Sequence, residues 1–375
     1  MHILIAPNAF KNSLDAAQVA EAIAQGLQQS RLECTTECFP IADGGDGTGS
    51  LIVQSCRGER AQCLVHDPLG RIINSSFGLI DRGKTAVIEM ADASGLRLLN
   101  KAELDPMHAS SFGTGELIKA ALDTGVERII IAMGGSATVD GGCGILSALG
   151  IAFFDAEGKA LNAIPKELIN MARIEAADLD SRILNCELAI LCDVNNKLLG
   201  PEGAAAIFGP QKGASEHNVP VLNNFLKNFA AISLTQTGKD MAAIKHGGAA
   251  GGATAGLYTW INAKLVNGID YFLSLTGFDE ALKRSDLVIT GEGSIDSQTL
   301  QGKGPYGVAV KAKEKGIPVI GLAGKVEPSK EMENYFDELI AINPEPVDIV
   351  IAMKNTQQNL VGTARVIGDR MTPIN

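Results

Sequence analysis

The sequence is poor in aromatic residues and in basic charge. Aromatic side chains make up 5% of its 375 residues, with a single tryptophan, whereas 46% of the residues are hydrophobic. A core of Ala, Ile, Leu and Val is the usual filling of parallel α/β layers, so this composition favours that class. Thirty-two Lys and Arg against 43 Asp and Glu give a formal net charge of −11, so neither nucleic acid nor a membrane surface is expected as a partner.

Other features are absent as well. No apolar stretch reaches the roughly 18 residues needed to cross a bilayer, and the opening MHILIAP lacks the basic start and cleavage site of a signal peptide. The seven cysteines are scattered without a CxxC pair, and the five histidines have no metal-ligand spacing. No GxSxG nucleophile motif is present. We therefore expect a soluble, cytoplasmic protein with reduced thiols and no hydrolytic triad.

Helix and strand patterns alternate at both ends of the chain. HILIAP (2–7) indicates a buried strand, residues 15–27 have helical spacing, and a second strand is expected around 36–41. Between 61 and 90, three β-rich runs separated by turn residues predict an antiparallel insertion. After 111 the alternation resumes and continues to the end.

The pattern predicts two α/β domains. One is a Rossmann-like, doubly wound parallel sheet built from both chain ends, residues 1–55 and 280–375. The other is an inserted mixed-sheet α/β domain, residues 56–279. Two continuous domains split near residue 240 are the alternative.

Three glycine-rich segments carry acids or hydroxyls where strands should end. They are ADGGDGT (42–48), MGGSATVDGGCG (133–144) and ITGEGSID (289–296). Glycine lets the backbone approach an anion and present its N–H groups, and a nearby carboxylate can hold the cation that accompanies a nucleotide. The combination indicates phosphoryl transfer with a nucleotide and Mg²⁺.

The first two segments provide candidate ligands. Asp43 and Asp46 could reach one Mg²⁺, although Asp46 or Thr48 could instead cap a helix. In the second segment a tight turn with an aspartate cap is the alternative to phosphate binding. The residues predicted there to bind the nucleotide are Gly44, Gly45, Gly134, Gly135, Ser136, Thr138, Asp140 and Gly141.

The third segment and two isolated residues supply further candidates. Gly291 and Glu292 are predicted to contact the nucleotide, and so is Lys212 of GPQKGA. Asp296 with Lys303 could act as general base and charge stabiliser, a solvated loop being the alternative. The predicted catalytic residues are Asp193, Asp296 and Lys303.

Substrate contacts are expected at two further positions. Lys11 and Ser13 follow the first strand, where α/β folds bind ligands. Arg71, in HDPLGR, could hold a carboxylate through two hydrogen bonds. A solvated lysine and a turn arginine are the alternatives.

Taken together, APNAFKNSL, PIADGGDGT, VHDPLGR, SFGTGELI, GGSATVDGG and DLVITGEGSIDSQTLQGKGPYGVA resemble the type I bacterial glycerate kinases, in the family's order. The resemblance implies ATP with Mg²⁺ as cofactors and an active site in the cleft between two α/β domains. It also implies phosphorylation of D-glycerate at the 2-hydroxyl, giving 2-phosphoglycerate. One departure is Val139, where the family usually has asparagine.

A mechanism follows from this resemblance. Arg71, Lys11 and Ser110 would hold the substrate carboxylate, and Asp193 or Asp296 would accept the hydroxyl proton. A kinase that forms 3-phosphoglycerate, or one for a related hydroxy acid, is an alternative, and so is a non-catalytic sugar-acid binding protein. A nicotinamide oxidoreductase is disfavoured because PNAFKNS lacks the glycines of GxGxxG. Assembly into a homo-oligomer is left open.

Overall fold

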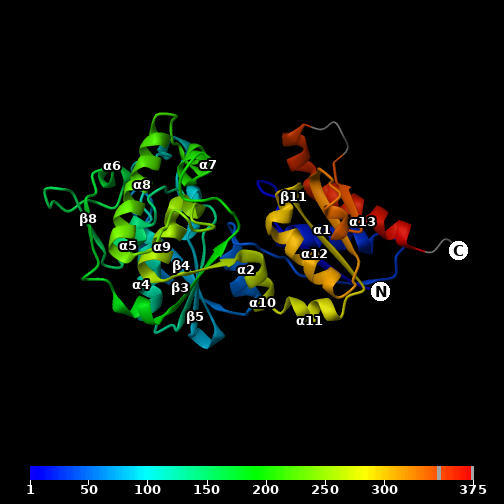
Figure 1. The fold of residues 1–375 in the computed structure, drawn as a ribbon. Coiled ribbons are helices and arrows are strands. Elements are labelled where there is room, and N and C mark those ends of the chain that lie inside the picture. Colours follow the sequence, from blue (N-terminus) through cyan, green and yellow to red (C-terminus); the bar gives the residue numbers. More distant parts are fainter. Residues whose placement is uncertain (344–347, 373–375) are drawn as a thin grey trace. The chain divides into compact units, whose positions relative to one another are not determined.

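The computed structural model describes residues 1–343 and 348–372. It is an α/β protein with two compact units, residues 1–43 with 269–375, and residues 44–268 (Figure 1). A parallel sheet and a mixed sheet are present, so the predicted fold class is confirmed. The domain division with boundaries at 55/56 and 279/280 stays a prediction, and residues 344–347 and 373–375 of its first domain lie outside the described residues.

The first unit contains a five-stranded sheet in which every neighbouring pair is parallel. Its strand order is β2-β1-β11-β12-β13. The strands are β1 (His2–Pro7), β2 (Thr35–Cys38), β11 (Leu287–Ile295), β12 (Val319–Val326) and β13 (Glu338–Ala341). Strands from both ends of the chain therefore share one sheet, because β1 pairs directly with β11.

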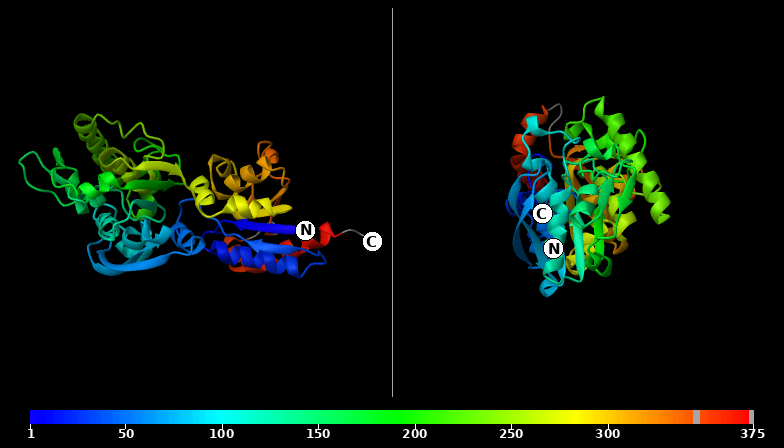
Figure 2. Two further views of the ribbon diagram at one scale, coloured as in Figure 1. Left: turned by 90° about the horizontal axis from the view of Figure 1, so that it is seen from below. Right: turned by 90° about the vertical axis from the view of Figure 1, so that its left-hand side faces the viewer.

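Helices cover both faces of this sheet. They are α1 (Ala16–Gln28), α10 (Gly268–Leu275), α11 (Phe278–Lys283), α12 (Gly304–Glu314) and α13 (Ile349–Met371). Figure 2 shows α1 and α13 on one face and α12 on the other. Asp15 caps α1 by accepting a hydrogen bond from the Gln18 N–H (2.8 Å). The apolar face of α1 packs on the sheet, where Ile5, Ile23 and Ile289 are buried in one core.

The second unit contains a six-stranded mixed sheet in the order β10-β9-β6-β5-β4-β3. Its strands are β3 (Glu59–His66), β4 (Ile72–Ile80), β5 (Thr85–Glu89), β6 (Arg128–Ala132), β9 (Glu187–Cys192) and β10 (Lys264–Asn267). The predicted antiparallel insertion is confirmed, since β3, β4 and β5 pair antiparallel. β5, β6, β9 and β10 pair parallel.

The remaining elements of this unit complete its core. β7 (Ala152–Phe154) and β8 (Arg173–Glu175) form an antiparallel pair. The helices are α2 (Thr48–Ser55), α3 (Ala91–Ser94), α4 (Phe112–Asp123), α5 (Cys143–Ala148), α6 (Pro165–Leu168), α7 (Ala204–Phe208), α8 (Asn218–Thr237) and α9 (Ala253–Ile261). Their apolar faces enclose one hydrophobic cluster that includes Ile131, Leu146 and Phe229. Over the ranges 1–343 and 348–372, none of the helices has the length and apolar character to cross a bilayer.

The expectation that a strand ends at the glycine-rich segment 289–296 is wrong for most of that segment. β11 continues to Ile295, which pairs with Val326 of β12. A Cβ atom on Gly291 would lie 2.2 Å from the Leu322 carbonyl oxygen. This glycine is therefore explained by close approach between strands, a role that the sequence pattern alone did not distinguish from loop formation.

The contact between α1 and α13 depends on Gly26. A Cβ atom there would lie 2.3 Å from the Val361 carbonyl oxygen, so Gly26→Ala should overpack the interface and cost about 1–3 kcal/mol of unfolding free energy. Gly362→Ala is the matched control, because a Cβ there would meet no atom within 4 Å. It should be neutral or stabilise by up to about 1 kcal/mol. Urea denaturation measures both, and equal stability of the two variants would contradict the prediction.

Candidate functional site

The strand order of the first unit identifies where a ligand should bind. The order changes direction between β1 and β11, and open α/β sheets bind ligands beyond the carboxyl ends of the strands at such a point. Asn8 directly follows β1, and its N–H donates to the Gly291 carbonyl oxygen (2.8 Å). Glu292 is the next residue along β11 and therefore lies at the same place.

Glu292 is a buried carboxyl group with a shifted pKa. Its side chain is 8% exposed, and Oε1 accepts a hydrogen bond from the Thr299 hydroxyl (2.8 Å). Burial raises the pKa of Glu292 to about 7, while Lys303, Thr299 and Lys11 oppose this rise and Asp43 adds to it. The structure thus brings together four predicted site residues, namely Lys11, Asp43, Glu292 and Lys303.

The Asp43 side chain contacts the N-terminus of α12. Its Oδ2 accepts hydrogen bonds from the Asn8 side-chain amide (2.9 Å) and from the Gly304 N–H (3.2 Å) in the first turn of α12. A carboxylate is stabilised there by the unpaired N–H groups of a helix N-terminus. Asp296 is half-buried, and its Oδ1 accepts from the Gln298 N–H (2.8 Å) in a local turn.

In the second unit, Asp140 holds the glycine segment that follows β6. It is fully buried, with Oδ2 accepting from the Ser111 N–H (2.8 Å), the Ser111 hydroxyl (2.7 Å) and the Gly144 N–H (3.2 Å). Oδ1 accepts from the Gly142 N–H (3.0 Å). Both oxygens are therefore engaged within the protein, which indicates that Asp140 positions the segment. Its predicted contact with the nucleotide stays a prediction.

Lys212 is a buried basic residue that contacts this glycine segment. The side chain is 2% exposed, and Nζ donates to the Ser136 hydroxyl (2.7 Å) and to the Thr138 carbonyl oxygen (2.7 Å). Desolvation lowers the pKa of Lys212 to about 7, opposed by the charge of Asp140. Among the described residues, the buried Thr138 hydroxyl has no hydrogen-bond partner. An ammonium and an unpartnered hydroxyl on one glycine segment could bind an anion.

Two predicted segments touch each other through their backbones. The Gly134 N–H donates to the Gly44 carbonyl oxygen (3.1 Å). A Cβ on Gly134 would lie 2.3 Å from the carbonyl carbon of Gly45, so a larger residue there would separate the segments. Gly135 has a φ of +71° and Gly141 one of +64°, a region that favours glycine.

Sequence reasoning missed a charged group beside Asp46. Arg97 donates to Asp46 (3.1 Å) and also pairs with Asp92. Glu89, at the end of β5, is 3% exposed and accepts a hydrogen bond from the Gly47 N–H, and burial raises its pKa. The available signal was a carboxylate ending the apolar run TAVIE. In the part of the chain that the structure describes, no three His, Cys, Asp or Glu side chains form a metal-ligand set.

Arg71 and Ser110 lie beside one turn. The Arg71 guanidinium pairs with Asp67 and with Glu103 (2.7 Å). Hydrogen bonds from the Asn100 N–H, which has the larger effect, and from Arg71 lower the pKa of Glu103 below its usual range. The Ser110 N–H donates to Pro68 in the same turn, and its hydroxyl donates to the Ala163 carbonyl oxygen (2.9 Å).

Asp193 follows β9 and is half-buried. Like every other predicted role in the site, its role as a base stays a prediction.

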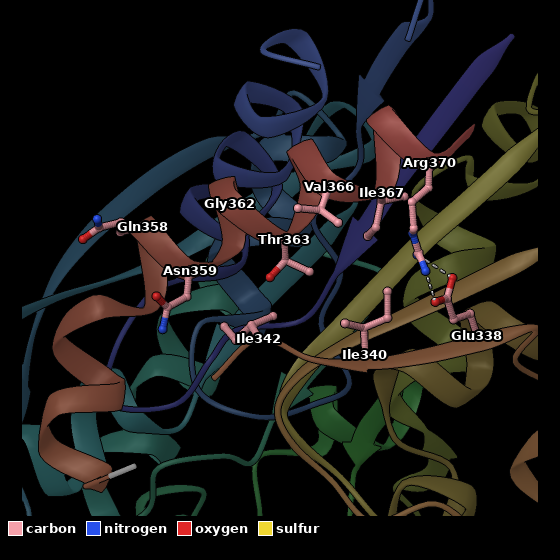
Figure 3. Close-up of a pocket in the computed structure, with 10 residues that line it drawn as sticks. All are labelled: Glu338, Ile340, Ile342, Gln358, Asn359, Gly362, Thr363, Val366, Ile367 and Arg370. Carbon is pink, nitrogen blue, oxygen red and sulfur yellow. Dashed lines mark hydrogen bonds and ion pairs between the residues drawn. The ribbon is translucent and has the colours of Figure 1, made fainter. Parts of the chain in front are cut away.

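A cavity of about 550 Å³ lies between α13 and the edge strand β13 (Figure 3). Its ionisable lining residues, Glu338 and Arg370, are paired with each other through two hydrogen bonds (2.8 and 2.9 Å). Figure 3 shows Ile340, Ile342 and Val366 along the rest of the groove. The groove lies along the length of β13, and its two labelled ionisable residues are paired with each other. We therefore do not assign a catalytic role to it.

Comparisons with known proteins agree on one family. The sequence profile of the Glycerate kinase family matches residues 3–372. Glycerate kinases of Halalkalibacterium halodurans and Bacillus subtilis are each 42% identical, over 97% and 98% of this chain respectively and 97% of their own lengths. The glycerate 2-kinase of Escherichia coli is 42% identical over 87% of this chain and 86% of its own. A crystal structure from Salmonella typhimurium LT2, described as glycerate kinase 2, has a TM-score of 0.83 and 41% identity, covering 99% of this chain and 98% of that one.

The raised pKa of Glu292 predicts a pH-dependent effect of Glu292→Gln. The glutamine can still accept the Thr299 hydrogen bond but carries no charge. Between pH 4.5 and about 7 the unfolded chain ionises this group before the folded one does, so wild-type stability falls relative to the variant. The two should be similar below pH 4.5, and the variant should be more stable above pH 7, by at most about 3 kcal/mol. Denaturation at pH 4, 6 and 8 measures this, and a difference that is constant with pH would contradict it.

Proposed function

Because this chain belongs to the glycerate kinase family, we propose that it transfers the γ-phosphoryl group of ATP to the 2-hydroxyl of D-glycerate, giving 2-phosphoglycerate. The observation that carries the proposal is the group around Glu292, where a carboxyl with a pKa of about 7 lies near Lys303 and Lys11 at the point where strand order reverses. A general base works best when its pKa is near the working pH, and cations offset charge on transferring phosphate.

In the proposed reaction the acceptor oxygen bonds to phosphorus, and the bond between the γ-phosphorus and the bridging oxygen of ADP breaks. The hydroxyl proton passes to a carboxylate oxygen of Glu292. Lys303 stabilises the ionised form of Glu292 and the negative charge on the reacting phosphate. The transition state is loose, so positioning and electrostatics supply most of the catalysis. Asp193 and Asp296 are the competing bases predicted from the sequence.

The Lys212 segment supplies a second set of contacts. An anionic oxygen beside the Lys212 ammonium would favour its charged form and oppose the desolvation that lowers its pKa. The Thr138 hydroxyl and the glycine N–H groups would add neutral hydrogen bonds. We propose that this oxygen belongs to a phosphate of ATP.

The donor set also fits Mg²⁺. This ion is commonly bound by one or two carboxylates together with phosphate oxygens, so a three-ligand protein set is not required. Asp43 would provide a carboxylate oxygen, because the hydrogen bonds from Asn8 and Gly304 both go to Oδ2. When bound, the ion would offset charge on the phosphate oxygens. Asp46, the other predicted ligand, is paired with Arg97.

An ATP-consumption assay across small hydroxy acids tests the function. D-glycerate should give the highest turnover, and ³¹P NMR of the product should show the phosphate on C2. A reaction without acceptor is the control, since hydrolysis of ATP by water should be slow. Consumption with another hydroxy acid but not glycerate, or a phosphate on C3, would overturn the corresponding part of the proposal.

The identity of the base is tested by comparing three variants. Glu292→Gln should lower kcat by roughly 10²-fold or more, with the KM for glycerate within a few-fold of wild type. The rise of kcat/KM with pH, expected near pH 7 in the wild type, should disappear. Asp193→Asn and Asp296→Asn serve as comparisons. If Glu292→Gln retains near-normal turnover while either of these is inactive, the base is the other carboxylate.

A further inference from the structure

A second cavity, of about 430 Å³, lies within the first unit. Its walls come from the segment after β1, from the carboxyl-terminal parts of β11 and β12, and from the first turns of α13. It therefore lies at the edge of the sheet where ligands of open α/β folds bind. Lys11 is one of its lining residues and is also close enough to Glu292 to affect its ionisation. The cavity thus shares Lys11 with the surroundings of the proposed reaction site.

The size of the cavity argues against glycerate as its main occupant. Cavities of roughly 300–1,000 Å³ typically hold ligands of drug size, and glycerate is much smaller than these. A nucleoside has the required size. The charge is also suitable, because Lys11 and Lys325 line the cavity and none of its lining residues is acidic. Lys325 is ion-paired with Glu327 (2.5 Å), so Lys11 is the better candidate to meet a phosphate.

The lining also offers a flat surface and apolar walls. Gly293 and Gly324 lie on the adjacent strands β11 and β12, and a Cβ on Gly324 would lie 2.7 Å from the Gly293 carbonyl oxygen. That contact explains Gly324 by close approach of the two strands. A Cβ on Gly293, in contrast, would meet no atom closer than 3.8 Å, so the missing side chain of Gly293 leaves room for a planar ring. Phe10 and Ile349 are apolar lining residues, and Ile349 is 67% exposed. Apolar walls of this kind are typical of small-molecule sites, which are lined mainly by apolar side chains.

A polar group is held in place at one side of the cavity. The Asn343 amide nitrogen donates to the Gly324 carbonyl oxygen (2.8 Å), and its oxygen accepts from the Asn359 amide (2.9 Å). These two bonds fix which way the amide points. The nitrogen carries a second hydrogen and the oxygen a second lone pair, so Asn343 can donate to and accept from one ligand edge. A purine presents adjacent donors and acceptors of this kind.

We propose that this cavity binds the nucleoside of the phosphoryl donor, with the base over Gly293 and Gly324 and the phosphates directed to Lys11. The inference rests on the proposed kinase function and adds the location of the nucleoside to it. It reassigns Lys11, which the sequence analysis placed at the substrate carboxylate. Ser13 also lines the cavity, but its hydroxyl donates to the Met353 carbonyl oxygen (2.7 Å) and holds α13 in place.

Filling the cavity tests the inference. Ala352 lines it and is 7% exposed, so Ala352→Phe should occupy the space of the base. Ile351→Phe is the matched control, because Ile351 is the preceding residue, is 54% exposed and is not a lining residue. Calorimetry with a non-hydrolysable ATP analogue should show affinity weakened about tenfold or more in Ala352→Phe only, with the KM for glycerate changed less than about threefold. An unchanged ATP affinity with a raised KM for glycerate would overturn the inference.

Photolabelling of the wild type with 8-azido-ATP gives a second test that does not depend on a variant folding. Label should appear in peptides that contain Phe10 or Met353 and should be lost with excess ATP. Label confined to the segment 133–144 would overturn the inference. The calorimetric affinity and the labelling are both measured without turnover. If glycerate gives no ATP consumption but the analogue binds and labels these peptides, the cavity assignment stands and the proposed acceptor fails.

Discussion

The buried carboxylate of Asp140 is the interaction on which the site of the second unit depends. It accepts four hydrogen bonds, from the Ser111 N–H and hydroxyl and from the N–H groups of Gly142 and Gly144. These bonds satisfy a charge that would otherwise be costly to bury, and they fix the path of the glycine segment. The same charge partly offsets the desolvation of Lys212. Without it, a lysine so removed from water would be held neutral more strongly.

In the first unit the carboxyl group of Glu292 is also buried. Lys303 and Thr299 only partly compensate for its loss of hydration, so its pKa remains near 7. A group left in this state lowers the stability of the fold at neutral pH and gains the ability to exchange a proton there. Asp43, in contrast, is placed at the start of α12, where the Gly304 N–H stabilises its charge. The two carboxylates thus differ in environment, which suits one for moving a proton and the other for holding a cation.

Glycine contributes to the site mainly by permitting close approach. Gly134 allows contact with the backbone of Gly45, and Gly291 allows contact with Leu322 across two strands. At Gly293, in contrast, the absence of a side chain leaves open space in the nucleoside cavity that we propose. Glycines in glycine-rich segments therefore have different structural roles within one protein. Only the neighbouring atoms show which role applies at each position.

The sequence by itself determined the α/β class, the antiparallel insertion and the family. These follow from local periodicity, from turn residues and from ordered motifs, all of which are properties of short segments. The candidate residues on the glycine segments were also visible in the sequence. The continuation of β11 through 289–295 was not, because pairing with β12 overrode the loop preference of glycine.

Tertiary structure alone decided the chemical state of those candidates. Lys212 meets Ser136 across 76 residues, and Asp43 meets Gly304 across 261. The pKa of a buried group depends on the water it loses and the charges that surround it, and residues so distant in sequence supply both. Sequence motifs therefore identified the candidate ionisable groups, whereas the tertiary structure determined their hydrogen-bond partners, their exposure to solvent and the shifts of their pKa.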